Sequence, residues 1–107
     1  MATYTNVSYA VKNVSTSGST VTTVSSGTTL ISSLVVSNTS VSPITCDAYV
    51  TRSAVNYYLV KGATVPTGGA LEVIQGNRII LQTSDALVVV SSAATSADAW
   101  VSGMTVV

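Results

Sequence analysis

Histidine and phenylalanine are absent from this 107-residue chain, and cysteine occurs once. Without His and with a single Cys, the usual ligand sets of zinc, copper and iron–sulfur sites are missing. The Ser–His–Asp and Cys–His forms of nucleophilic catalysis require a His that this sequence does not contain. We therefore expect no metal site, no cofactor and no enzymatic activity.

Charge is also scarce, because four Lys and Arg residues balance four Asp and Glu residues and charged side chains make up 7% of the sequence. A soluble domain typically has about 25%. The few basic residues are scattered and leave no electrostatic footprint for nucleic acid. No acid-rich loop predicts a calcium site, and a glycosidase-like carboxylate pair is a minor alternative, for which the candidates are Asp47, Glu72, Asp85 and Asp98.

Segments that would address the chain to a membrane are missing as well. The N-terminus has neither the basic region nor the apolar region of a secretory signal, and the apolar run 86–90 is too short to span a bilayer. We expect no membrane partner.

Cys46, which alternates with polar neighbours, is expected to be a small buried core residue. Arg52 and Lys61 are expected to form local salt bridges with Asp47 or Glu72.

Hydroxyl and β-branched residues take the place of charge, with 17 Ser, 16 Thr and 19 Val. Val and Thr form helices poorly and favour pleated strands. Apolar and polar residues alternate with a period of two in many segments, which is typical of half-buried strands. Strands are predicted over 3–12, 20–24, 28–37, 44–51, 55–60, 71–74, 78–82, 86–91 and 98–106.

The breaks between these strands carry turn residues. Ser25-Ser26-Gly27 and Lys61-Gly62 punctuate the chain, and Gly76-Asn77 predicts a tight hairpin. Eight to nine short strands, with a turn about every 8–12 residues and no helix, predict an all-β fold, an antiparallel β-sandwich or small barrel. Jelly-roll and immunoglobulin-like topologies both fit. We expect one domain over 1–107, in which 1–19 form an N-terminal strand or arm and a Ser/Thr-rich loop.

Strand spacing and turn residues form a pattern over the segments 57–62, 65–72, 78–81, 85–89, 91–94 and 98–103. On this pattern, residues from about 20 to 107 resemble small β-sandwich virion proteins of tailed bacteriophages. It implies a virion protein made in the host cytoplasm, most plausibly a capsid decoration (cement) protein. Such a protein would form a homotrimer and bind the major capsid protein of the assembled shell. A tail, neck or fibre component is the alternative within the virion.

Aromatic residues are the candidate contacts. Tyr57 and Tyr58 are adjacent and must point to opposite faces of a strand, while Trp100 alternates with Ala99 and Val101. Trp100 is therefore either an exposed anchor or a large core residue. Tyr and Trp are enriched at interface hot spots. The predicted interface residues are Tyr58, Trp100, Met104, Tyr4, Val7 and Tyr9, with 1–11 as an arm that reaches a neighbour.

A carbohydrate-binding module is the alternative from another class of function, and it would use Tyr57 or Tyr58 together with Trp100. The composition favours the assembly hypothesis. Ser and Thr occupy the outward positions of most predicted strands, and an isolated domain with so little charge lacks the usual protection against self-association. We therefore expect much of this hydroxyl-rich surface to be covered by other subunits.

Overall fold

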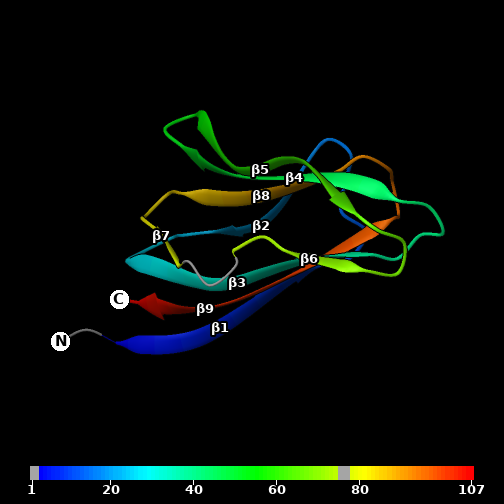
Figure 1. The fold of residues 1–107 in the computed structure, drawn as a ribbon. Coiled ribbons are helices and arrows are strands. Elements are labelled where there is room, and N and C mark those ends of the chain that lie inside the picture. The colour runs from blue at the N-terminus through cyan, green and yellow to red at the C-terminus, as the bar shows by residue number, and fades with distance from the viewer. Residues whose placement is uncertain (1–2, 75–77) are drawn as a thin grey trace.

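The structure, a computed structural model, describes residues 3–74 and 78–107, and this part of the chain contains strands and no helix. The predicted all-β sandwich is confirmed. Figure 1 shows the strands in two layers. They are β1 (Tyr4–Val11), β2 (Ser19–Thr23), β3 (Thr28–Asn38), β4 (Ile44–Arg52), β5 (Val55–Val65), β6 (Ala70–Glu72), β7 (Ile79–Leu81), β8 (Ala86–Ser91) and β9 (Ala97–Val106).

Both layers are antiparallel sheets. The first sheet has the order β1-β9-β3-β6, with β7 also paired to β3, and the second has the order β2-β8-β4-β5. The pairing is nested, because β1 meets β9, β2 meets β8, β3 meets β6 and β7, and β4 meets β5. This nesting is the jelly-roll arrangement. An immunoglobulin-like sandwich would place the first two strands in one sheet. Here they lie in different sheets, so the topology that the sequence left open is the jelly roll.

The core lies between the two sheets and is built from alternate residues of each strand. On β4, Ile44, Cys46 and Ala48 are buried, while on β9 the buried residues Ala99 and Val101 flank an exposed position. A strand with one face on the core and one in solvent produces this alternation. The prediction that Cys46 is a buried core residue is confirmed.

β5 is longer than expected, since it continues through Lys61-Gly62 to Val65. Gly62 adopts a left-handed conformation with a φ of 65°, and its N–H donates to the Asp47 carboxylate at 2.7 Å. The pairing with β4 shifts register on either side of Ala48. The glycine therefore forms a bulge in a continuing strand, and the predicted break at Lys61-Gly62 is wrong.

The N-terminal segment belongs to the first sheet. β1 pairs with β9 from Tyr4 opposite Val106 to Val11 opposite Ala99. The strand that was predicted here is present, but the expected arm reaching a neighbour is not, because the chain's own β9 holds these residues. The termini consequently lie at the same end of the molecule (Figure 1).

β6 and β7 both lie along the same side of β3, at its two ends. Each has three residues, so the predicted strands over 71–74 and 78–82 are shorter than expected. The hairpin predicted at Gly76-Asn77 falls outside the described residues.

The ion pair of Arg52 links the end of β4 to the turn before β8. Its guanidinium binds both oxygens of the buried Asp85 carboxylate, with Nε at 2.9 and 3.1 Å, and the Gln82 N–H donates to the same carboxylate at 2.8 Å. The bond from the Gln82 N–H closes the turn before β8. The expected partners of Arg52, Asp47 and Glu72, were wrong, because strand pairing brings Asp85 to β4 instead.

Candidate interaction surface

The outward side chains of the first sheet form rows that cross β1, β9 and β3. Alternation with the buried Ala99 and Val101 turns Asp98, Trp100 and Ser102 outward. The register then places three rows side by side on this surface. They are Ala10–Trp100–Val35–Glu72, Ser8–Ser102–Ser33 and Asn6–Met104–Leu30–Ile80.

We call the surface made by these rows, with Tyr4 and Val106 at its end, the docking face. Tyr4, Ile80 and Trp100 are exposed, and Met104 is half-buried. The largest of these side chains on the face, Trp100, leaves 55% of its surface open to solvent. Trp100 is therefore an exposed residue, as an anchor would be, and not a core residue. The face combines exposed Trp and Met side chains with few charges, and both features are typical of an interface core.

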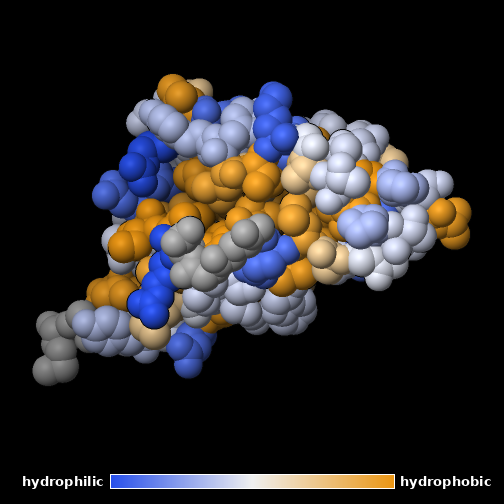
Figure 2. Space-filling model, viewed as in Figure 1, coloured by the Kyte–Doolittle hydropathy of each residue, from blue (hydrophilic) through white to orange (hydrophobic). Residues whose placement is uncertain are grey.

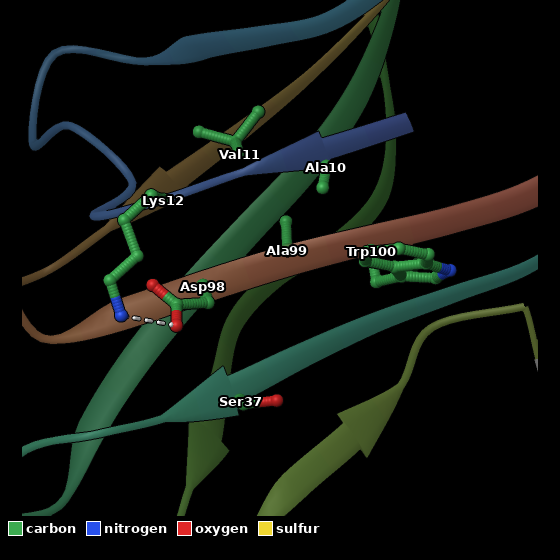
Figure 3. Close-up of a pocket in the computed structure, with 7 residues that line it drawn as sticks. All are labelled: Ala10, Val11, Lys12, Ser37, Asp98, Ala99 and Trp100. Carbon is green, nitrogen blue, oxygen red and sulfur yellow. Dashed lines mark hydrogen bonds and ion pairs between the residues drawn. The ribbon is translucent and has the colours of Figure 1, made fainter. Parts of the chain in front are cut away.

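A groove of about 310 Å³ runs beside Trp100 where β1 ends and β9 begins. Figure 3 shows Trp100 at one end of it and the ion pair of Lys12 with Asp98 at the other. The Lys12 ammonium lies 3.0 Å from the Asp98 carboxylate, which also accepts the Asn13 N–H at 3.0 Å. These contacts, the backbone bond first, hold the pKa of Asp98 below its ordinary value. The pair is ionised but has no net charge.

The second sheet presents a smaller aromatic cluster. Tyr58 on β5 lies opposite Tyr49 on β4, with ring centroids 5.1 Å apart, and the Lys61 ammonium lies 4.5 Å from the centre of the Tyr58 ring. Tyr58 is exposed, as expected for an interface residue. A cation above the ring occupies part of that surface.

Tyr57 lies on the other side of β5 and borders the opening between the two sheets. This opening, of about 300 Å³, is lined by Val50, Arg52, Tyr57, Ile80 and Leu81. In Figure 2 hydrophobic side chains gather along this side of the molecule, between the two layers. Both tyrosines belong to β5 of the second sheet, whereas Trp100 projects from the first. The joint sugar platform of Tyr57 or Tyr58 with Trp100 is therefore wrong.

Val7 and Tyr9 lie on the inner side of β1. Both are half-buried, and Tyr9 packs against the core. The structure thus brings Trp100, Met104 and Tyr4 onto one face, leaves Tyr58 on the other sheet, and turns Val7 and Tyr9 inward. An interface role for all six stays a prediction. Leu30, Val35 and Ile80 were missed, because their place beside Trp100 or Met104 depends on strand register, which alternation alone does not give.

Chemically reactive groups are few on these surfaces. Burial, and secondarily the nearby Asp47 carboxylate, raises the pKa of the Cys46 thiol. Within the described residues, no three His, Cys, Asp or Glu side chains gather in a way that could hold a metal ion. In the same part of the chain, no helix has the length and apolar character needed to cross a membrane.

The sequence matches no protein-family model and no curated protein. Among solved structures, the chain is similar to a protein of Bacillus endospore appendages, which are described as a novel family of disulfide-linked pili. The TM-score is 0.54 at 12% sequence identity, over 97% of this chain and 87% of the other. At that identity the likeness shows a shared fold.

Proposed function

We propose that this protein is a structural subunit that works by docking, in many copies, within a larger assembly, and that it has no catalytic role. The docking face is the observation that supports this most directly. It places Trp100, Met104 and Ile80 on the outside of a sheet, among hydroxyls, the ion pair of Lys12 with Asp98, and the Glu72 carboxylate that accepts from Ser33. Aromatic side chains with few charged neighbours are typical of the centres of interfaces.

Within that class, we propose decoration of the capsid of a tailed bacteriophage. The sequence resemblance supports this setting, and mass action gives the physical reason. A protein that binds only the assembled shell stabilises that state by its binding free energy, and repetition over many copies multiplies a modest contact. The homotrimer and the contact with the major capsid protein belong to this proposal.

The test is cosedimentation of the purified chain with expanded and unexpanded shells of the phage whose genome carries its gene. We expect saturable binding to expanded shells and little binding to unexpanded ones. Equal binding to both forms, or none, would contradict the decoration proposal. Analytical ultracentrifugation of the chain alone over a wide concentration range tests the oligomer, since a monomer at every concentration would contradict a preformed trimer.

A subunit of a filamentous appendage is the second candidate, favoured by the fold likeness over 97% of the chain. The neighbouring protein's pili are described as disulfide-linked, whereas the single cysteine of this chain is 1% exposed in β4. Filaments of this chain would therefore be held by non-covalent contacts. Electron microscopy of the concentrated protein under reducing conditions would reveal such filaments, and their absence would favour decoration.

A further inference from the structure

The outer edge of β1 is an unpaired strand edge. β1 pairs with β9 over eight residues without a shift of register, and no other strand of the described residues pairs with it. The edge of a sheet presents unpaired N–H and C=O groups that can bind another strand. Natural proteins usually block such edges with charges, prolines, bulges or short length.

The other edges of this sandwich carry these protections. β5 has two register shifts, a left-handed Gly62 and the charged Lys61. β2 has five residues and a register shift, and β6 and β7 have three residues each. β1 has eight residues and contains no charge, proline or glycine. It is the long and regular edge among the described strands, and it lacks the features that block pairing with another strand.

The alternation of hydrogen-bonded pairs along β1 identifies which backbone N–H and C=O groups point away from β9, toward the free edge. Thr3 and Val107 exchange both backbone hydrogen bonds, at 2.8 and 3.0 Å. Hydrogen-bonded and non-hydrogen-bonded pairs alternate along an antiparallel ladder. Because the register is unbroken, every second residue from Thr3 bonds toward β9. The free N–H and C=O groups therefore belong to Tyr4, Asn6, Ser8 and Ala10.

We infer that β1 pairs antiparallel with β1 of a second copy, about a twofold axis at Val7. The four outward residues are symmetric about Val7, so Tyr4 opposes Ala10 of the other copy and Asn6 opposes Ser8. In this register all four are hydrogen-bonded pairs, and any other register leaves outward groups unpaired. The occupant is a second copy, because the proposed multi-copy assembly brings identical β1 edges together and β1 carries no charge that would repel its copy in an isologous contact.

Pairing in this way also extends the docking face. The first sheets of two copies become one continuous sheet, and the two docking faces lie side by side across the axis. This contact rests on the proposed function, because a multi-copy assembly supplies the second strand. It is twofold, so in a decorated shell it would join one trimer to the next rather than close a trimer.

A cysteine introduced at the axis tests the register. Residue 7 and its copy form a non-hydrogen-bonded pair, with Cα atoms about 4.5 Å apart, within the range that a disulfide spans. Val7→Cys should therefore form a cross-linked dimer under mild oxidation. Thr5→Cys is the matched control, since residue 5 lies about 14 Å from its copy in this register. Cys46 is buried and does not compete.

Paired charge variants test whether the edge forms the contact without cross-linking. Asn6→Lys with Ser8→Lys places like charges opposite each other in the dimer, whereas Asn6→Lys with Ser8→Glu places opposite charges there. We expect the first to weaken association in ultracentrifugation by about tenfold and the second to restore it. Circular dichroism of both variants confirms that they are folded.

The two arms separate this inference from the proposed function. If the wild-type chain assembles but Val7→Cys cross-links no faster than Thr5→Cys, the edge contact is wrong and the structural role stands. If the two charge variants associate equally, the register about Val7 is overturned. If the wild-type chain neither assembles nor binds shells and Val7→Cys gives no cross-link, both proposals fail. Selective cross-linking of Val7→Cys by a chain that binds no shell would support the edge contact and overturn the decoration role.

Discussion

Replacing Trp100 by Ala should weaken assembly about a hundredfold. Trp100 has 55% of its surface exposed, and a Trp side chain buries up to about 250 Å² when it is fully covered. A partner that covers the docking face would therefore remove roughly 130 Å² of this side chain from water. At about 25 cal/mol per Å² that burial contributes about 3 kcal/mol, which corresponds to about a hundredfold in the dissociation constant.

The assay is the concentration dependence of sedimentation, with Tyr57→Ala as the matched control. Tyr57 is 56% exposed, almost the same fraction as Trp100, but it belongs to β5 of the second sheet and to none of the rows of the docking face, although it borders the opening that Ile80 also lines. We expect Tyr57→Ala to assemble like the wild-type chain. Trp100 is the single tryptophan, so the wild-type fluorescence should also shift to shorter wavelength as the indole is covered.

The reasoning would be refuted if Trp100→Ala assembled at the wild-type concentration and the wild-type emission did not shift. Equal losses of assembly in Trp100→Ala and Tyr57→Ala would show that exposed aromatic side chains act through nonspecific association. Urea unfolding of both variants provides the stability control, since a destabilised chain would lose assembly for another reason. Loss of assembly in a folded Trp100→Ala alone supports the docking face.

Three further predictions concern the fold that holds this face. Gly103→Ala should destabilise the chain by about 1–3 kcal/mol or more in urea unfolding, because its Cβ would lie against the Leu30 carbonyl of the paired strand; Ser102→Ala at the neighbouring outward position of β9 is the control, and equal costs would contradict the clash. The Arg52 hydrogen bonds hold the pKa of Asp85 below its ordinary value, so this carboxylate stabilises the fold above that value and the contribution is lost as pH falls through the lower folded-state pKa. The Tm of Asp85→Asn should therefore fall less than that of the wild-type chain on acidification, and parallel curves would count against the pair. Cys46 should react with a thiol reagent only on unfolding, since burial raises its pKa; rapid labelling of the native chain would show otherwise.

Alternation predicted the strands that have one face on the core. β4 and β9 are the clearest cases, because Ile44, Cys46 and Ala48, and likewise Ala97, Ala99 and Val101, are buried at every second position. A side-chain period of two is a local property, so it is readable from the sequence. The exposed position of Trp100 follows from the same period.

Contacts between residues that are far apart in the sequence do not follow from this local alternation. Gly62 is typical of a turn, but the Asp47 carboxylate that satisfies its N–H lies on the neighbouring strand. Arg52 finds Asp85 only because β4 pairs with β8. The sugar platform failed for a related reason: sequence shows that Tyr57 and Tyr58 point to opposite sides of a strand, but not which sheet that strand joins. Alternation therefore does not tell which short strand pairs with which.

The scarcity of charge acquires a physical meaning once the charged side chains are placed. Lys12 pairs with Asp98 and Arg52 with Asp85, Lys61 lies over Tyr58, and Asp47 and Glu72 accept backbone N–H groups from Gly62 and Leu34. Seven of the eight charged residues in the sequence therefore have an intramolecular partner. Their charge is used to hold bulges, turns and strand ends.

The outward positions of the docking face are left to hydroxyl and apolar side chains, such as Ser8, Ser33 and Ser102 between the rows of Trp100 and Met104. Removing a hydroxyl from water costs about 1–3 kcal/mol when it finds no partner, while an unpaired buried ion costs several kcal/mol or more. A partner that covers this face therefore has to accommodate the Glu72 carboxylate, whose oxygens already accept from the Ser33 hydroxyl and the Leu34 N–H. A surface that needed only to remain soluble would carry more charge, so the low charge of this face agrees with the proposal that it is covered in an assembly.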